Sequence, residues 1–194
     1  MINPWEVKDT PWKNESQYWN WVRSVLRKGW SRHPVKVQFV KDNRKRVPNP
    51  NPNGRGDSWG MTCNICKGDF ILPVAKALRD KLEKHSGEKL STIEINHKKE
   101  AGSLTCKEDL GRFASNLLFI NYEDLEPLCQ TCHAIVSYSQ KHNITFEEAR
   151  LAKRVIEIIN SKKVNEFLEE RGIEPASNAK KRRLQITEYL QENL

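Results

Sequence analysis

Four of the five cysteines form two pairs with the same spacing, and thiolates at this spacing bind zinc. The pairs are Cys63/Cys66 and Cys129/Cys132, and 62 residues separate them. Zinc favours four tetrahedral thiolate or imidazole ligands, and one tight turn can present two sulfurs to the same ion. We therefore predict one structural zinc; two unrelated pairs, or a redox pair, are the alternatives. Because four thiolates leave no open position, this ion is not expected to be catalytic.

Two histidines stand where their chemistry could be used. His97 ends the alternating segment "STIEIN" and is followed by Lys98 and Lys99. A histidine can take a proton from water near neutral pH, and neighbouring lysines can hold phosphates. His133 directly follows the second cysteine pair, where an imidazole can bind a metal. The alternatives are a half-buried structural role for His97 and zinc ligation by His133 in place of a cysteine.

The N-terminal third is predicted to hold a helix, a strand and a linker. Residues 14–30 predict a helix, because Asn14 and Gln17 have capping-box spacing and apolar residues recur at helical spacing, namely Tyr18, Val22, Val25 and Leu26. The arginines of this helix are expected on the opposite face. Residues 35–40 alternate and predict a short strand. Residues 48–57 contain repeated Asn-Pro and two glycines, which predict a linker between a basic arm and the core.

Further along the chain, helices and one strand are predicted. A helix is expected over 73–87, with Pro73 in its first turn and Gly87 past its end. A strand over 90–96 and a loop containing Gly102 and Gly111 follow. Two more helices are predicted over about 133–142 and 145–172, and Ser177 is the expected N-cap of a last helix.

The charge balance favours a polyanionic partner. The 194 residues carry a formal net charge of +8, with 30% charged and 37% hydrophobic residues. Nucleic acid is the usual partner of such a chain, and a membrane surface is the rival. No apolar run approaches the roughly 20 residues that span a bilayer, and the first residues lack the pattern of a signal peptide. We therefore expect a cytoplasmic DNA-binding protein that does not enter a membrane.

Eleven basic residues are the candidate nucleic-acid contacts. They lie in the first helix, in a cluster before the linker, after His97 and near the C-terminus: Arg23, Arg27, Arg44, Lys45, Arg46, Lys98, Lys99, Lys180, Lys181, Arg182 and Arg183. The C-terminal cations stand at a predicted helix start, where they oppose the helix dipole unless an anion lies there. An ordinary solvated basic surface is the alternative for this cluster and for Lys98 and Lys99.

The middle of the chain resembles the HNH endonucleases, which have the ββα-metal fold. "IEINHKKEAGSL" is similar to the family's strand ending in Asp-His and the loop after it, and "RFASNLLF" to its aromatic-bearing segment. "DLEPLCQTCH" is similar to its second cysteine pair followed by histidine, and "GWSRHPVKVQFV" to an arm found in phage members. The resemblance covers about residues 20–142. It implies an α+β fold with a small ββα-metal core, stabilised by the four-cysteine zinc site and flanked by helical N- and C-terminal extensions.

The resemblance also implies roles for single residues. His97 matches the general base, and Asn96 and His133 match the ligands of a catalytic divalent ion, Mg²⁺ or Mn²⁺. Asp124 lies nine residues before His133, where the family has an asparagine that pins the loop orienting the base. Asn116 is an asparagine, as the H-N-H pattern of the family expects, but it lies too far before His133. Asn96 replaces a charged or imidazole ligand, so we expect the ion to be held more weakly.

Together these features predict a three-part chain that acts on double-stranded DNA. The parts are a basic arm and linker (1–57), a zinc-stabilised nuclease core (58–142) and a basic helical extension (143–194). The expected activity is that of an endonuclease or nickase hydrolysing phosphodiester bonds. One alternative is a non-catalytic zinc-containing DNA-binding module. Another is a nuclease-like subunit of a phage DNA-packaging complex, with packaging proteins as partners.

Overall fold

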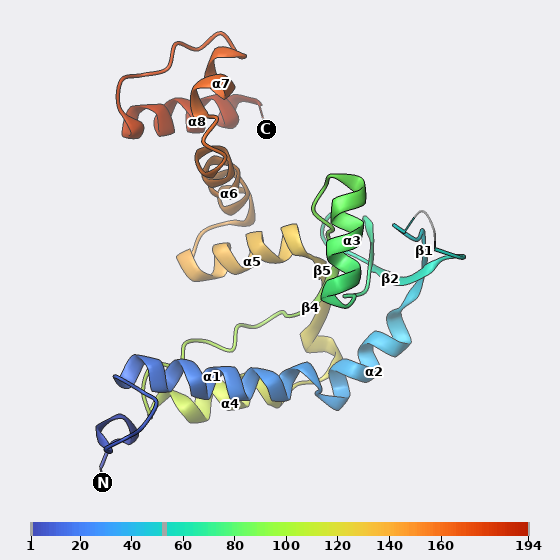
Figure 1. The fold of residues 1–194 in the computed structure, drawn as a ribbon, viewed down its shortest axis with the longest axis vertical. Helices are drawn as coiled ribbons and strands as arrows, with labels where there is room; N and C mark the ends of the chain where they lie inside the picture. Colours follow the sequence, from blue (N-terminus) through green and yellow to red (C-terminus); the bar gives the residue numbers. More distant parts are fainter. Residues whose placement is uncertain (1, 52–53, 194) are drawn as a thin grey trace. The chain divides into compact units, whose positions relative to one another are not determined.

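The computed structural model describes residues 2–51 and 54–193. It confirms the predicted α+β class, because helices alternate with two small antiparallel sheets (Figure 1). The chain divides into two compact units, residues 1–130 and 131–194, so the predicted boundaries after residues 57 and 142 do not coincide with this division. Among the described residues, no helix combines the length and the apolar character needed to cross a membrane.

Helix α1 (Glu15–Ser31) forms where it was predicted and follows the 3-10 turn η1 (Pro4–Glu6). The Asn14 side chain accepts a hydrogen bond from the backbone N–H of Gln17 at 3.0 Å. This bond satisfies one of the free amide groups at the helix start. The Gln17 side chain accepts from the backbone N–H of Lys13 at 2.8 Å rather than from that of Asn14. The predicted cap is therefore present, with its return bond shifted by one residue.

One face of α1 packs beside α4 (Asp109–Leu118), as Figure 1 shows. The buried side chains of this small core are Trp19, Leu104, Phe113 and Leu117, with Tyr18, Val22, Leu26 and Trp30 packed around them. The predicted apolar face is therefore correct except at Val25, which is 44% exposed. Trp19 supplies the buried position instead. Burial of this face holds the last turn of α1, and with it Trp30, against the rest of the unit.

Residues 35–40 belong to helix α2 (Pro34–Asn43), so the predicted strand is wrong. Six residues are too few for periodicity alone to separate a strand from a helix, and Pro34 at the first helical position favours the helix. The helix is held against the turn η2 (Tyr122–Asp124). The rings of Phe39 and Tyr122 lie 5.7 Å apart, and the Tyr122 hydroxyl donates to the Asp42 carboxylate at 2.7 Å. These contacts between residues far apart in the sequence stabilise the helical form of the segment.

The first sheet has the strand order β1–β2–β3, formed by Lys45–Val47, Ser58–Thr62 and Asp69–Ile71. Both pairs of strands are antiparallel, and Gly60 of the central strand lies between Lys45 and Ile71. A Cβ atom at Gly60 would collide with the Phe70 carbonyl and the Val47 side chain. The central strand therefore requires glycine at this position.

The predicted linker connects two paired strands of this sheet. Residues 48–57 join β1 to β2, and β1 pairs with β2 in register from Lys45↔Gly60 to Val47↔Ser58. The linker therefore does not separate a basic arm from the core, because the basic strand β1 belongs to the same sheet as the first cysteine turn. Pro52 and Asn53 of this linker lie outside the described residues.

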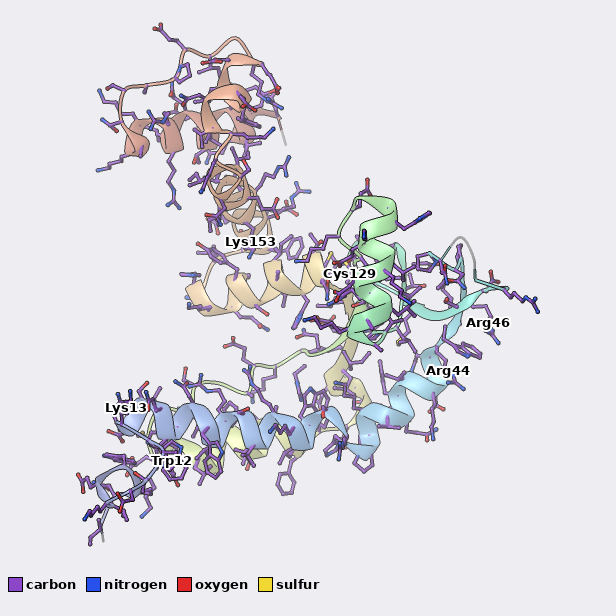
Figure 2. The ribbon with its side chains drawn as sticks, in the orientation of Figure 1. Trp12, Lys13, Arg44, Arg46, Cys129 and Lys153 are labelled. Carbon is purple, nitrogen blue, oxygen red and sulfur yellow. The ribbon has the colours of Figure 1, made fainter. Side chains whose placement is uncertain are left out.

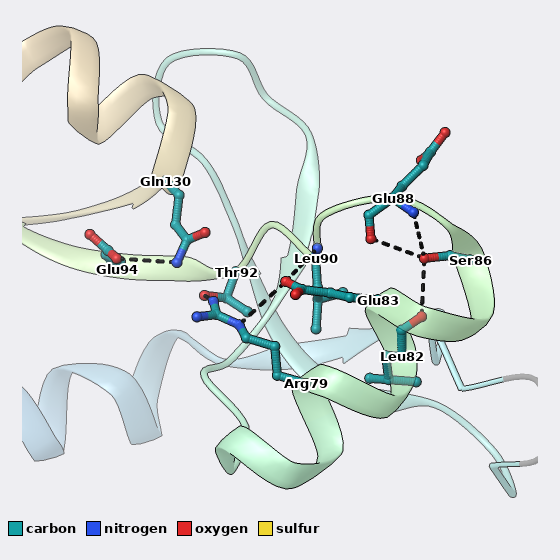
Figure 3. Close-up of polar contacts among 9 residues, drawn as sticks. All are labelled: Arg79, Leu82, Glu83, Ser86, Glu88, Leu90, Thr92, Glu94 and Gln130. Carbon is teal, nitrogen blue, oxygen red and sulfur yellow. Dashed lines mark hydrogen bonds and ion pairs between the residues drawn. The ribbon is translucent and has the colours of Figure 1, made fainter. Parts of the chain in front are cut away.

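Helix α3 (Lys76–Ser86) is the predicted helix between the cysteine pairs. Pro73 lies before it rather than in its first turn. Gly87 ends it in the left-handed conformation, with φ 72°, as expected for a glycine past a helix end. Figure 3 shows how α3 is attached: the Arg79 guanidinium donates to the Thr92 hydroxyl, and the Glu83 carboxylate accepts from the Leu90 N–H. The helix is thus tied to the residues that lead into the next strand.

The second sheet pairs β4 (Ile93–His97) with β5 (Leu125–Cys129) in antiparallel register. His97 lies opposite Leu125, and Ile93 lies opposite Cys129. Helix α4 and the turn η2 connect the two strands, so Gly111 lies in a helix and not in the predicted loop. At one end the pair presents His97 beside the η2 turn, and at the other it presents a cysteine.

The second unit is helical and has its own buried core. Helix α5 (Gln130–His142) leads into α6 (Phe146–Asn160), α7 (Val164–Glu169) and α8 (Ala179–Asn193). The buried side chains come from the last three helices and are Val155, Ile158, Leu168, Ile186 and Leu190. The unit therefore has a hydrophobic centre that does not depend on the sheets.

Two predictions for this unit are wrong in detail. The single helix expected over 145–172 is two helices, because the chain leaves α6 at Ser161 and Lys162 adopts a positive φ of 60°. The break lets Leu168 turn back into the core. Helix α8 is capped by Asn178 rather than Ser177, since the Asn178 side chain accepts from the Lys181 N–H at 2.9 Å.

Candidate functional site

The four paired cysteines converge, and their sulfur atoms all lie within 4.8 Å of one another. Cys63 directly follows β2, Cys66 lies in the next turn, and Cys129 ends β5 (Figure 2), while Cys132 lies in the first turn of α5. The first turn is closed by the Cys63 N–H, which donates to the Gly68 carbonyl at 2.8 Å. Four sulfurs in this arrangement can hold a structural metal such as zinc. Cys106, the fifth cysteine, is half-buried outside the cluster.

The backbone around Cys63 favours the thiolate form that binds metals. Burial opposes ionisation of the Cys63 thiol, but hydrogen bonds from the backbone at Cys129, Cys66 and Ile65 outweigh it and lower the pKa to about 7. The Asn64 N–H donates to the Pro127 carbonyl at 2.9 Å, which fixes the first cysteine turn against β5. The two cysteine turns are therefore joined by backbone bonds as well as by the sulfur cluster.

The His97 ring is held at the end of β4 by two contacts. Its Nε2 atom lies 3.2 Å from the Leu117 carbonyl oxygen, and its ring centroid lies 4.0 Å from that of Trp30. A carbonyl only accepts hydrogen bonds, so Nε2 carries the proton of the neutral ring and Nδ1 is left as an acceptor. Leu117 lies in the last turn of α4, where carbonyls lack a partner within the helix. The helix end therefore fixes the tautomer of the histidine.

The surroundings of His97 keep it neutral. Burial has the largest effect and lowers the pKa of His97 below its usual value; the Leu117 carbonyl opposes this, and the charge of Lys36 adds to it. The Lys36 ammonium lies 4.8 Å from the centroid of the Trp30 ring that packs on His97. Helix α2 thus brings a cation to the predicted base. A neutral imidazole is the form that accepts a proton from water.

Asn96 is buried and bonded to a carboxylate across the sheet. Only 7% of its surface is exposed, and its Nδ2 atom donates to Oε1 of Glu126 at 3.0 Å. Asn96 and Glu126 are register partners in the β4–β5 pair. This bond uses the amide nitrogen and leaves the amide oxygen as the atom for a cation. The predicted neutral ligand therefore has an acidic neighbour that the sequence analysis did not identify.

Asp124 closes the turn that lies next to His97 in the structure. Its carboxylate accepts a hydrogen bond from the Asn121 N–H at 2.7 Å, which closes the η2 turn. Its backbone carbonyl accepts from the Lys98 N–H at 2.9 Å, directly after the base. Asp124 thus stabilises a turn that is bonded to the chain next to His97. The carbonyl that orients the His97 ring is Leu117 in α4, outside this turn.

His133 lies in the first turn of α5, next to Cys132, and is half-buried. It belongs to the second unit, whereas His97 and Asn96 belong to the first. The predicted pairing of His133 with Asn96 around one divalent ion therefore stays a prediction. Asn116, which was set aside on spacing, lies within α4.

The basic residues of the N-terminal helix are not equivalent. The Arg23 guanidinium donates to the Leu104 carbonyl at 2.8 Å, and its Nε atom is buried. The prediction that Arg23 faces away from the core is therefore wrong, because it holds α1 to the loop before α4. Arg27 is exposed, as expected. His33 is half-buried at the start of α2, with its ring 5.9 Å from Trp30.

The other basic residues lie mostly on the surface. Lys98 and Lys99 are exposed directly after His97. The C-terminal cluster lies in the first turns of α8, where Lys180, Arg182 and Arg183 line a pocket of about 850 Å³ together with Lys162 and Lys163. Arg182 is partly fixed, because it donates to the Ala176 carbonyl at 2.8 Å. A concave surface with this many cations suits an anionic ligand.

Four groups that surround the predicted base and its neighbour were not predicted from the sequence. They are the Trp30 ring, the Lys36 ammonium, the Leu117 carbonyl and the Glu126 carboxylate. Glu126 faces Asn96 because residues 125–129 form β5, a strand that was not predicted from the sequence. The other three depend on how helices pack, and a backbone carbonyl has no signature in a sequence.

Comparisons of the chain with protein-family models, with curated proteins and with solved structures gave no match. The residues and their geometry are therefore the basis for assigning a function.

Proposed function

We propose that the protein is a metal-dependent endonuclease or nickase that hydrolyses phosphodiester bonds of double-stranded DNA, with His97 as the general base. The observation that carries the proposal is the setting of His97. One ring nitrogen is bonded to the Leu117 carbonyl, the ring packs on Trp30, and burial lowers its pKa. An imidazole fixed in this way presents an unprotonated nitrogen to a water molecule at neutral pH.

The resemblance of residues 20–142 to HNH endonucleases supports the same role for this histidine. In the proposed reaction, Nδ1 of His97 takes a proton from water, and the water oxygen attacks phosphorus. The bond from phosphorus to the 3′ oxygen breaks, and the leaving oxygen takes a proton from a second water molecule. The expected products are a 5′ phosphate and a 3′ hydroxyl. Asn96 and His133 would hold a divalent ion, which supplies charge stabilisation at the phosphate and the leaving oxygen when it is bound. Lys36 and Lys98 would add positive charge near the same phosphate.

The residues around Asn96 suit a hard cation. Mg²⁺ and Mn²⁺ prefer oxygen ligands, and the Asn96 side chain, whose amide nitrogen donates to the Glu126 carboxylate, keeps its amide oxygen for an ion. The carboxylate supplies the negative charge that an amide lacks. Glu126 is therefore a better candidate for a compensating anionic ligand than Asp124, whose carboxylate is already bonded within the η2 turn.

The structural zinc is part of the proposal but takes no part in the reaction. Cys63, Cys66, Cys129 and Cys132 would complete its shell, so that no position remains for water or substrate. Its proposed role is to join β2, β5 and the start of α5. The metal–sulfur bond at Cys129 would then anchor one end of the β4–β5 pair, whose other end carries Asn96, His97 and Glu126.

A plasmid-nicking assay tests the proposed activity. Purified, zinc-loaded protein is incubated with supercoiled DNA in Mg²⁺, in Mn²⁺, and without added divalent ion after dialysis against a weak chelator that leaves the zinc bound. The expected result is nicked or linear DNA with either ion and none without. A protein that binds the plasmid but never cleaves it, with its zinc content intact, would rule out the nuclease.

A second function has one observation in its favour. The Asn96 side chain brings no charge, and its amide nitrogen is already committed to Glu126. If this pair prevents ion binding, the protein is a non-catalytic zinc-containing DNA-binding module, or a nuclease-like subunit working with phage packaging proteins. In that case duplex DNA is bound in the nicking assay without being cut, and added Mg²⁺ changes neither result.

A further inference from the structure

Two exposed arginines of the first sheet are stacked on one tryptophan. The guanidinium carbons of Arg44 and Arg46 lie 4.3 Å and 4.1 Å from the ring centroid of Trp59. Arg46 is the register partner of Trp59 in the β1–β2 pair, and Arg44 precedes β1 by one residue. Residues two apart along an extended chain point to the same face, so both arginines can reach this ring. Figure 2 labels both arginines, one at the end of α2 and one on β1.

The stack leaves both cations available for an anion. Within the described part of the chain, neither guanidinium forms an ion pair with a carboxylate, and Arg46 donates one bond to the Asp57 carbonyl at 3.0 Å. Stacking occupies the flat face of a guanidinium and leaves its N–H edge free for bonding in the plane. Both arginines are exposed, and 39% of Trp59 is exposed. The surface therefore carries two oriented, uncompensated positive charges.

Lys45 lies between these arginines in the sequence but faces the other way. Its ammonium forms an ion pair with Asp69 of β3 at 2.7 Å. Arg44, Lys45 and Arg46 were predicted as one basic cluster, but the Lys45 ammonium does not lie on the face of the two arginines. Only Arg44 and Arg46 share a face, and Trp59 joins them there.

We propose that Trp59, Arg44 and Arg46 form a preorganised clamp for the phosphate backbone of duplex DNA, in which the two guanidinium groups bind neighbouring phosphates and Trp59 holds them in place. Arginine side chains lose rotamer freedom when they bind, and stacking on a ring removes part of that freedom in advance. A surface of two unpaired guanidinium groups in a chain of net charge +8 is complementary to a polyanion. Trp59 is a positioning residue in this account, and it was not among the residues identified from the sequence.

The clamp rests on the DNA-binding part of the proposed function and does not depend on cleavage. Its test is the fluorescence anisotropy of a labelled duplex, titrated with zinc-loaded protein at several NaCl concentrations without Mg²⁺. The double variant Arg44→Gln/Arg46→Gln should reduce the slope of log affinity against log salt by about 1.8, the value for two phosphates. The single variants Arg46→Gln and Lys45→Gln remove the same charge from the same strand. Arg46→Gln should lower the slope by about 0.9 and Lys45→Gln should leave it nearly unchanged.

Trp59 is tested by changing the ring while both arginines stay. Trp59→Leu should weaken binding about 5- to 10-fold, because both arginines must then be ordered on binding, and Trp59→Phe should restore most of the affinity. Trp21→Leu, at another exposed tryptophan (50% exposed), is the matched control and should bind as the parent does. Thermal melting and zinc content establish that each variant is folded.

Each outcome of these titrations decides the proposal. Equal slopes for Arg46→Gln and Lys45→Gln, or unchanged affinity for Trp59→Leu, overturn the clamp, while a parent that still binds and nicks DNA leaves the proposed function standing. A parent with no affinity for duplex DNA overturns both. Binding to anionic lipid vesicles that is lost in the same variants, in a parent with no affinity for duplex DNA, would show that the surface recognises phosphate groups of a membrane instead of DNA.

Discussion

At the scale of single residues, the proposed chemistry depends on the protonation of His97. The Leu117 carbonyl fixes the proton on Nε2, and burial against Trp30 disfavours the charged ring. A base in this state is ready for use at neutral pH without a conformational change. The structure thus supplies two conditions for a general base, orientation and neutrality, from groups more than 15 residues away in sequence.

The first prediction concerns the pH dependence of nicking. The pKa of His97 is lowered from 6.5, so the neutral ring persists on the acid side of that value. The midpoint of the decline in rate on acidification should therefore lie below pH 6.5. Lys36→Met removes a charge that lowers this pKa, so the decline should begin at a higher pH than in the parent. Single-turnover rates at saturating Mn²⁺ between pH 5 and 8 provide the measurement, and a decline that starts above pH 7 in the parent contradicts the assignment.

The second prediction concerns the ion near Asn96. Asn96→Asp adds a negative charge to the ligand set and should lower the Mg²⁺ concentration for half-maximal nicking, by about 5-fold for 1 kcal/mol of added binding energy. Asn96→Ala and Glu126→Gln should raise it. A carboxylate can also over-stabilise the ion before the reaction, so the maximal rate need not increase with affinity. Identical metal dependence in all four proteins would show that neither side chain acts on the ion.

The residues of the site divide clearly into those that the sequence could reveal and those that it could not. The four cysteines were identified from spacing alone, because two short turns must each present two sulfurs to one ion. His97 and Asp124 were identified through a resemblance that depends on the order of motifs. Trp30, Lys36 and the Leu117 carbonyl could not be found, since they come near His97 only when α1, α2 and α4 pack around the end of β4.

At the scale of secondary-structure elements, the predictions failed where a tertiary contact outweighs a local pattern. The alternating residues 35–40 fit a strand, yet Phe39 and Asp42 bind Tyr122 only when α2 is helical. The helix predicted over 145–172 breaks at Lys162 because a turn there returns Leu168 to the core. By contrast, α1 and the end of α3 followed their local signals, the Asn14 cap and Gly87. Helix caps and terminal glycines act on residues within one turn, so a short stretch of sequence is enough to predict their effect.

The third prediction compares two glycines in different elements. Gly60→Ala should destabilise the first sheet by about 1–3 kcal/mol, because its methyl group would collide with the Phe70 carbonyl and the Val47 side chain. Gly111→Ala is the matched control within helix α4, where a methyl group meets no atom within 4 Å. It should stabilise the protein by roughly 0.5–1 kcal/mol. Urea denaturation measures whether the free energy of unfolding falls or rises in each variant. A Gly60→Ala protein as stable as the parent would contradict the packing of this sheet.

At the scale of the whole molecule, the four-cysteine cluster links segments that are far apart in the chain. It brings together the turn after β2, the end of β5 and the first turn of α5. The sheets are small, with two or three strands, and sheets of this size are marginally stable alone. A metal bound by the four cysteines would therefore contribute directly to folding.

The fourth prediction follows from this arrangement. Purified protein should contain one zinc per chain, and removal by a strong chelator should unfold the first unit. Cys129→Ser should do the same, whereas Cys106→Ser, which changes the cysteine outside the cluster, should keep both metal and fold. Elemental analysis and circular dichroism give the two readouts. Zinc-free protein with unchanged circular dichroism and melting temperature would remove the structural role of the metal.

The central claim, that His97 is the base of a DNA-cleaving site, is tested most directly by one comparison of nicking rates. Zinc-loaded parent, His97→Ala and His142→Ala are assayed on supercoiled plasmid under single-turnover conditions at saturating Mn²⁺. His142 is exposed in α5 and serves as the control histidine. His97→Ala should lower the rate by about 10²- to 10⁴-fold, with unchanged duplex binding and zinc content, and His142→Ala should cleave as the parent does. A His97→Ala protein that nicks DNA at the parental rate would contradict the account.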